Sequence, residues 1–170
     1  MNVHEAIKKR WAVRNYRPNP VPEESLNKIL EAARLAPSAH NKQGWKFIVV
    51  KDSSKRKKLS KASGQDFLAK APIIIAGVAL DPDYIMDSEV PAYAVNLGIA
   101  MEHIALSAVE EGLGTCWIGS FSQKEAKEVL KIPEKYKIVA LMPIGFPADK
   151  STPKFRKDLK KIACYENFIE

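Results

Sequence analysis

Two arginines lie four positions apart near the start of the chain, in the segment Arg10-Trp11-Ala12-Val13-Arg14. A guanidinium group keeps its charge at physiological pH and can hold a phosphate through two parallel N–H groups. The segment is therefore a candidate phosphate site. Either arginine alone would be assigned to a surface salt bridge, and that alternative stays open at this point.

Small and amide side chains gather in residues 36–45, which read Ala-Pro-Ser-Ala-His-Asn-Lys-Gln-Gly-Trp. Asn41 and Gln43 offer both hydrogen-bond donors and acceptors, which suits the edge of a planar heterocycle. Pro37 and Ala39 would let a flat ring approach closely. An ordinary polar loop has a similar composition, so composition alone leaves both interpretations open.

A third cluster, Lys154-Phe155-Arg156, follows Pro153 near the end of the chain. Alternate residues of an extended segment point to the same side, so the two cations would be presented together. Such a pair suits an anionic group. The alternative is a basic tail surrounded by solvent.

The composition is that of one folded domain covering residues 1–170. Hydrophobic residues make up 46% and charged residues 28%, and the formal net charge is +7. Nucleic-acid binding is disfavoured, because aromatic residues do not alternate with the basic ones as stacking platforms would require. The N-terminus does not read as a signal peptide, and Glu102 and His103 interrupt the longest apolar stretch. We therefore expect no membrane span and a cytoplasmic protein.

Several catalytic motifs are absent from the sequence. It has neither G-x-G-x-x-G nor Walker A, and no serine lies in a G-x-S-x-G frame. The three histidines are far apart, and Cys116 and Cys164 lack metal-ligand spacing, so no metal site is predicted. Cys116 is expected to be a small buried side chain in an apolar strand.

Helical and strand patterns mix along the whole chain, which indicates an α/β or α+β protein. The apolar run at 73–80 is typical of a strand covered on both faces. The helix at 93–111 carries apolar residues around most of its circumference, so it should be buried at the centre of a domain or a dimer. The tail from Phe146 is expected to be an extended arm. Helices are predicted at 3–10, from 23 to before Pro37, and at 53–62, 93–111 and 123–130, with strands at 45–50, 73–80, 115–118 and 138–144.

Four segments, in order along the chain, resemble the nitroreductase family of FMN-dependent oxidoreductases. Residues 10–14 resemble its Arg-Arg-Ser-hydrophobic-Arg box, and residues 36–45 its Ala-Pro-Ser-x-x-Asn-x-Gln-x-Trp pattern. Residues 112–119 match Gly-Leu-Gly-Thr-x-Trp-Ile-Gly, and Gly145-Phe146-Pro147 followed by Lys154-Phe155-Arg156 resembles its last Gly-aromatic-Pro step and basic element. The resemblance implies a three-layer α+β fold, with a central, mostly antiparallel sheet between helices and a C-terminal arm reaching the partner subunit.

The resemblance also implies a role for each matching residue. Arg10, Lys154 and Arg156 would hold the phosphate or ribityl side of FMN. Arg14 would lie near N1 and O2 of the flavin ring. The other cofactor-binding residues would be Trp11 and Ala12 in the same box, Pro37, Ser38, Ala39 and Asn41 from the other subunit, Gln43 as support for that loop, Gln65 at the pyrimidine edge, and the backbone of Ile118 and Gly119 at the N5 side.

Two positions depart from the family pattern. Ala12 stands where the family usually has serine, so one hydroxyl contact to the flavin is lost. Asn96 stands in the long apolar helix where many members have an acid. Neither change removes the basic residues that would hold the phosphate.

The implied activity is hydride transfer from NADH or NADPH through flavin N5 to a small electron acceptor, such as a nitroaromatic, a quinone or a flavin, in a ping-pong order. No side chain is needed as an acid or base for the hydride step, so no catalytic residue is assigned. The implied assembly is a homodimer with FMN sites at its interface. Two alternatives remain: a non-catalytic protein that stores FMN, and a specialised flavoenzyme of the same family.

Overall fold

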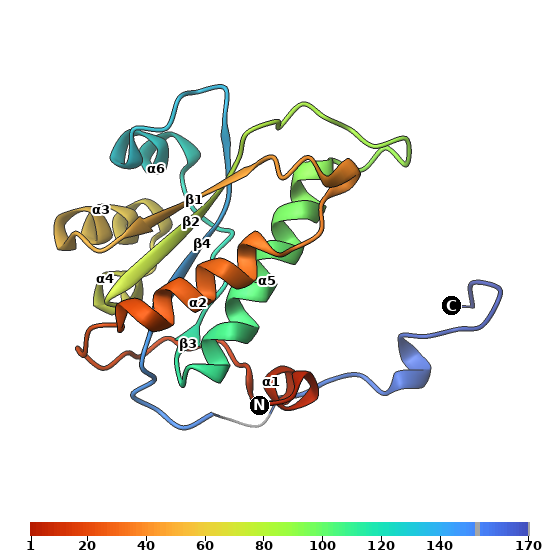
Figure 1. Cartoon of the computed structure of the whole chain (residues 1–170), viewed down its shortest axis with the longest axis horizontal. Coiled ribbons are helices and arrows are strands. Elements are labelled where there is room, and N and C mark those ends of the chain that lie inside the picture. Colours follow the sequence, from red (N-terminus) through yellow and green to blue (C-terminus); the bar gives the residue numbers. More distant parts are fainter. Residues whose placement is uncertain (152–153, 170) are drawn as a thin grey trace.

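A computed structural model describes residues 1–151 and 154–169 of the chain. Four strands form one antiparallel sheet in the order β1-β2-β4-β3, and helices cover both faces (Figure 1). The predicted three-layer α+β fold is confirmed. The helices are α1 (Val3–Lys9), α2 (Glu23–Arg34), α3 (Ser53–Ser63), α4 (Phe67–Lys70), α5 (Ala92–Glu110) and α6 (Gln123–Leu130), and the strands are β1 (Trp45–Val50), β2 (Ile73–Ala79), β3 (Gly114–Thr115) and β4 (Lys137–Gly145).

Strand β2 shows how the layers are built. All seven of its residues are buried, as the unbroken apolar run predicts. Ile73, Ile75 and Ala79 belong to the core shared with α2 and α5. Ile74 and Ala76 point to the opposite face, into the core shared with α3 and α6. The alternation of side chains along a strand therefore serves two separate cores.

Helix α5 is only partly buried in a single chain. Its inner side packs on the sheet and on α2 through residues such as Leu97, Met101 and Ile104. Its outer side is incompletely covered, and Val95 remains 39% exposed. The expectation of burial nearly all round is therefore met on one side only. By length and composition α5 could cross a membrane, but core helices meet the same weak criterion.

The predicted helix and strand bounds agree with the structure except in a few places. The strand expected at 115–118 is shorter, because only Gly114–Thr115 pair with β4 as a strand and Ile118 forms an isolated bridge to Leu141. Helix α4 has only four residues, too few for a visible helical period. Two short 3₁₀ helices, at Ala39–Asn41 and Leu159–Lys161, were missed for the same reason.

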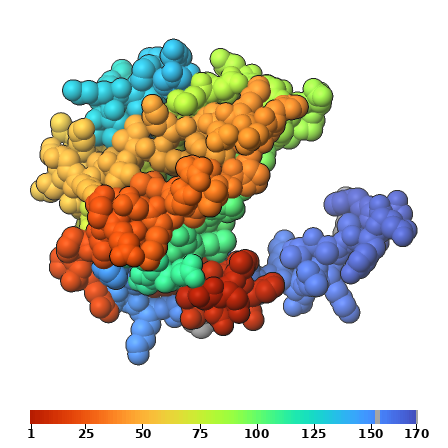
Figure 2. Space-filling view, in the orientation of Figure 1, coloured from red at the N-terminus to blue at the C-terminus, as the bar shows by residue number. Residues whose placement is uncertain are grey.

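The C-terminal segment leaves the body of the protein as an arm (Figures 1 and 2). Residues 154–169 contain only the short 3₁₀ helix at Leu159–Lys161. Large apolar side chains of this arm are highly exposed, including Phe155 at 87% and Tyr165 at 89%. This shape agrees with the arm expected from the sequence.

Candidate functional site

The arginine segment is fixed by the sheet beside it. Ala12 forms a parallel bridge with Thr115, and the Val13 N–H donates to the Thr115 carbonyl at 2.9 Å. Val13 is fully buried, whereas Arg14 is exposed. A Cβ atom at Gly114 would overlap the side chain of Val13, so the close approach of the two segments requires glycine there.

The two basic segments predicted from the sequence meet in one pocket. Its volume is about 260 Å³, and it is lined by Arg10, Trp11, Ala12, Arg14, Lys154 and Arg156. Loss of water, and then the charges of Arg10 and Arg156, lower the pKa of Lys154. The cations therefore repel one another in this pocket, and a bound anion would relieve that repulsion.

Lys154 also fastens the arm to the body of the protein. Its ammonium group donates to the Lys8 carbonyl at 2.7 Å and to the Arg10 carbonyl. These carbonyls lie at the C-terminal end of α1, where a cation is favoured by the helix dipole. Arg156 lines the same pocket, and its Nη1 donates to the Phe155 carbonyl at 2.8 Å.

One carboxylate lies among these cations. Glu102 of α5 pairs with Arg10, with 3.3 Å between Nε and Oε1. Its other oxygen accepts a hydrogen bond from the indole N–H of Trp117 at 3.1 Å. In the sequence, Glu102 stands out only as an interruption of an apolar stretch. The sequence carries no signal for this contact, because Arg10 and Trp117 are far from Glu102 along the chain.

The loop at 36–44 holds an unusual backbone conformation. His40, Asn41 and Gln43 have φ angles of 51°, 53° and 51°, in the left-handed region that residues other than glycine seldom adopt. Contacts inside the loop hold it in place: Ser38 Oγ accepts from the Gln43 N–H at 2.9 Å, and Gln43 Nε2 donates to the Asn41 carbonyl at 3.1 Å. Such strained residues cluster at functional sites.

Asn96 connects this loop to α5. Its Oδ1 accepts a hydrogen bond of 3.0 Å from the Ala39 N–H. In the sequence, Asn96 stands out only as a departure from the family pattern. In the structure it is the side chain that positions the start of the 3₁₀ turn.

The loop and the arginine pocket are separated in a single chain. The turn at Ala39–Asn41 lies beside the first turns of α5, whereas residues 10–14 lie beside β3, which follows the last turn of that helix (Figure 1). The structure therefore unites the first and third sequence clusters but not the second.

Three remaining candidates, Gln65, Ile118 and Gly119, belong to segments that adjoin the contacts of the arginine segment. Gln65 precedes α4, whose Phe67 packs on the small core formed by Val13 and Tyr16. Ile118 uses both its N–H and its carbonyl in hydrogen bonds with Leu141, at 2.9 and 3.0 Å. Gly119, which follows, is exposed.

Two buried titratable groups border the site. Burial raises the pKa of the Cys116 thiol, against the opposing charges of Arg14 and Arg10. Cys116 is 3% exposed, as predicted. Burial also raises the pKa of Tyr16, whose hydroxyl donates to the Val13 carbonyl at 2.7 Å. Within the described residues, no cluster of potential metal ligands is found.

Comparisons with known proteins place this geometry in a family context. The family model "Nitroreductase family" matches residues 7–72 and 60–146. An FMN reductase (NAD(P)H) of Bacillus subtilis is 32% identical over 176 residues, covering 93% of this chain and 71% of that protein. An FMN-dependent nitroreductase of Clostridium difficile R20291 superposes with a TM-score of 0.85 at 34% identity, covering 96% and 98% of the two chains. A nitroreductase family protein of Clostridium novyi NT gives 0.84 at 36% identity, covering 88% and 87%.

Proposed function

This chain belongs to the nitroreductase family, and from that membership we propose that it is an oxidoreductase that uses FMN and takes its electrons from NADH or NADPH. The names of its relatives, FMN reductase and FMN-dependent nitroreductase, support the cofactor and the donor. We take residues 1–170 as one domain with this function, located in the cytoplasm.

The observation that carries the proposal is the crowding of Arg10, Arg14, Lys154 and Arg156 around one small pocket. Loss of water and then the charges of Arg10 and Arg156 lower the pKa of Lys154, so the neighbouring cations add to the cost of its charge. A phosphate monoester brings up to two negative charges and several acceptor oxygens, which suits four cations. The pocket therefore fits the phosphate end of FMN, which we assign to Arg10, Lys154 and Arg156.

The pocket is too small to enclose a whole flavin. Its volume of about 260 Å³ is below the roughly 300–1,000 Å³ of sites that bury a drug-sized ligand. The ring must then lie outside it, along a surface completed by other groups. We assign Arg14 to the N1 and O2 edge, Gln65 to the pyrimidine edge and Gly119 to the N5 side, since Ile118 already pairs with Leu141. Trp11 and Ala12 line the pocket floor between the arginines.

The loop at 36–44 supplies the missing wall if it comes from a second copy of the chain. Pro37, Ser38, Ala39 and Asn41 lie on this loop, which contacts α5 near its start through Asn96, whereas Ala12 pairs with β3 beyond the end of that helix (Figure 1). Its strained turn is held by Gln43 and Asn96, so its shape is fixed before any ligand arrives. We propose that each subunit of a homodimer lends this loop to the other subunit's flavin.

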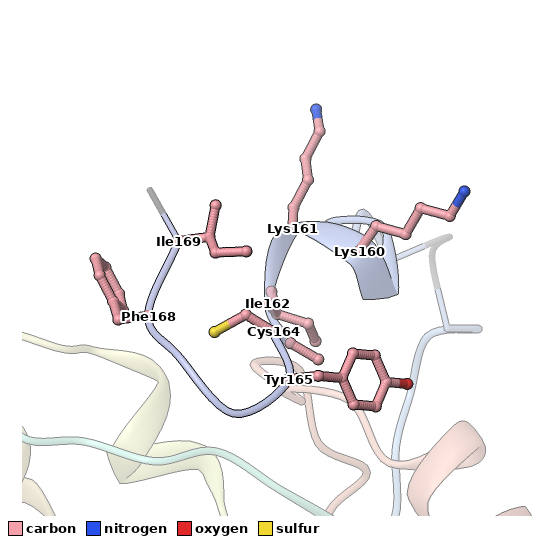
Figure 3. Close-up of a pocket in the computed structure, with 8 residues that line it drawn as sticks. Lys160, Lys161, Ile162, Cys164, Tyr165, Phe168 and Ile169 are labelled. Carbon is pink, nitrogen blue, oxygen red and sulfur yellow. The ribbon is translucent and has the colours of Figure 1, made fainter.

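Two exposed apolar surfaces support the homodimer. On α5, Val95 is exposed, and Gly98 and Ile99 lie half-buried on the adjoining surface. On the arm, Cys164, Tyr165, Phe168 and Ile169 line a concave pocket of about 550 Å³ (Figure 3). Burying such apolar area is worth about 25 cal/mol per Å². A second copy can cover both surfaces, and a sedimentation experiment that finds a stable monomer with bound FMN would refute the dimer.

FMN held by Arg10, Lys154 and Arg156 would supply hydride transfer at N5 between NADH or NADPH and a small acceptor, for which we propose a ping-pong order. The protein contributes binding and electrostatics. Arg14 adds a positive charge where negative charge develops in the reduced ring. The connection from Leu80 to Pro91 is short, which favours an open site that admits nitroaromatics, quinones or free flavin in turn.

The absorption spectrum of the purified protein tests the proposal. A visible flavin band, together with oxidation of NADH or NADPH by a quinone or nitroaromatic, is expected. A colourless protein that takes up no added FMN would contradict the function. A yellow protein without turnover would support FMN storage instead.

The assignment of the phosphate contacts has its own test. Arg10→Ala and Arg156→Ala should each weaken FMN binding by about tenfold or more, because each removes a charge-assisted hydrogen bond. Lys57→Ala, which removes an exposed cation of α3, is the matched control. Variants as yellow as the parent would show that these arginines do not hold the phosphate.

A further inference from the structure

We propose that Glu102 is a positioning residue that links the phosphate end of the cofactor site to the segment following β3. The inference rests on the proposed function and adds to it a residue that no sequence motif includes. Glu102 lies on α5, and its two oxygens engage donors from two different segments, Arg10 and Trp117.

The contact with Arg10 leaves most of the guanidinium available. Glu102 approaches Arg10 at Nε, 3.3 Å from Oε1, and within the described residues the terminal Nη groups of Arg10 donate no hydrogen bond, so they remain for another acceptor. The backbone of Arg10 is held as well, because Lys154 donates to its carbonyl. An arginine fixed at both its backbone and its Nε loses less side-chain freedom when it binds a phosphate.

Through its second oxygen, Glu102 also contacts Trp117, which precedes Ile118 and Gly119 at the proposed N5 side of the site. Trp117 lies between Cys116, near the arginines, and Ile118, which bridges to Leu141. Its indole N–H donates to Glu102 at 3.1 Å although the side chain is 36% exposed. The backbone that leads to Gly119 is therefore tied to the same anchor as Arg10.

A different role for Glu102 predicts the opposite effect on binding. A carboxylate that merely neutralises Arg10 would compete with the phosphate, and its removal would strengthen FMN binding. A carboxylate that orients Arg10 would weaken FMN binding when removed. The sign of the change therefore separates the two roles.

The experiment compares FMN and riboflavin, which differ only in the phosphate. Apoprotein of the parent and of each variant is titrated with both ligands, and binding is followed by quenching of flavin fluorescence. For Glu102→Ala, the ratio of FMN affinity to riboflavin affinity should fall about tenfold, as for the loss of a charge-assisted hydrogen bond. A role confined to folding would lower both affinities together and leave the ratio unchanged.

A near-isosteric variant guards against a folding defect. Glu102→Gln keeps one acceptor oxygen, for which Arg10 and Trp117 must compete, so the ratio should fall less than with alanine. Trp117→Phe removes the competing N–H, so the single amide oxygen of Glu102→Gln is left to Arg10. In the double variant Glu102→Gln/Trp117→Phe, the ratio of FMN affinity to riboflavin affinity should therefore rise toward that of Trp117→Phe alone.

Three outcomes would overturn the proposal. Tighter FMN binding by Glu102→Ala would show a competing counterion, and an unchanged ratio would show that Glu102 does not act on the phosphate end. A double variant no better than Glu102→Gln would remove the link through Trp117. If the parent protein binds riboflavin and FMN equally, or neither, the proposed function fails first, so the two failures are distinguishable.

Discussion

The Ala39 N–H donates to Asn96 Oδ1 at 3.0 Å, and this contact joins a strained loop to the long helix α5. The turn that begins at Ala39 contains two consecutive residues with left-handed φ angles, His40 and Asn41. Each such residue costs on the order of 1 kcal/mol or more, so the turn persists only where its surroundings hold it. Asn96 is one of those restraints.

Asn96→Ala should loosen the loop and weaken FMN binding about fivefold, which corresponds to the loss of one hydrogen bond of roughly 1 kcal/mol. Asn96→Asp keeps an acceptor oxygen at the same place and should bind FMN more tightly than the alanine variant does. Fluorescence titration of the apoproteins measures both. If Asn96→Ala bound FMN as tightly as the parent protein does, the loop would keep its shape without this contact.

FMN affinity should fall at alkaline pH, and the fall should begin at a lower pH than it would if Lys154 had the pKa of an ordinary lysine. The pKa of Lys154 lies below its usual 10.5 because of lost water and the neighbouring arginines. A phosphate binds the charged ammonium better, so affinity is highest below this lowered pKa and falls as pH rises through it. The stability of the protein without FMN should change in the opposite direction and rise as pH increases through the lowered pKa. The charged Lys154 disfavours the folded state, and its deprotonation removes that penalty.

Measuring the FMN dissociation constant from pH 7 upward tests this assignment, with riboflavin as the control for titration of the ring. Lys154→Arg should flatten the phosphate-specific part of the profile, because arginine keeps its charge throughout this range. A variant profile identical to that of the parent would assign the pH dependence to another group.

Gly114→Ala should destabilise the fold by about 1–3 kcal/mol, as expected for overpacking of a core. The added Cβ would overlap the side chain of Val13, which is fully buried. For a chain of this size, each kcal/mol lowers Tm by about 2–4 °C. Thermal unfolding of Gly114→Ala, Val13→Ala and the double variant should show non-additive losses, because truncating Val13 makes room for the methyl group. Fully additive losses would mean that the two residues do not meet.

The reduction potential of the bound flavin should depend on Arg14. Arg14→Ala should lower the potential by about 30 mV if the side chain stabilises the reduced ring by about 1.4 kcal/mol. Arg14→Lys keeps a positive charge and should lower it less. Potentiometric titration of the holoprotein gives both values, and an unchanged potential would place Arg14 away from the ring.

Phe168→Ser should weaken the homodimer, because Phe168 is 84% exposed in one chain and lines the concave face of the arm (Figure 3). Burial of a phenylalanine side chain is worth about 1.5–3 kcal/mol, so the dimer dissociation constant should rise at least tenfold. Lys157→Ala, at an exposed residue of the same arm that does not line this pocket, is the control. Sedimentation at several concentrations distinguishes them.

Local pattern was sufficient for most of the fold. The apolar run at 73–80 predicted a strand covered on both faces, and the helix predicted at 93–111 is α5 at Ala92–Glu110. Short elements were not predicted from the sequence, because a four-residue helix such as α4 contains barely one turn and shows no period. The short length of β3 was not predicted either, because the length of a strand depends on its pairing with a partner that is distant in sequence.

The candidate site was predictable only where residue type alone suggests chemistry. Arg10, Arg14, Lys154 and Arg156 were identified from their charges, and the structure gathers them around one pocket. The supporting contacts of Asn96 and Glu102 were not predictable, because an amide or carboxylate on an apolar helix does not indicate which distant group it meets. Tertiary packing alone selects those partners.

The pocket lined by Arg10, Arg14, Lys154 and Arg156 brings together Arg10 and Lys154, which are 144 positions apart. During synthesis, the first of these leaves the ribosome long before the second exists. A chain that ends before Lys154 would carry only the Arg10–Arg14 half of this pocket. The pocket is therefore complete only after residue 156 has been synthesised, because its lining comes from both ends of the chain.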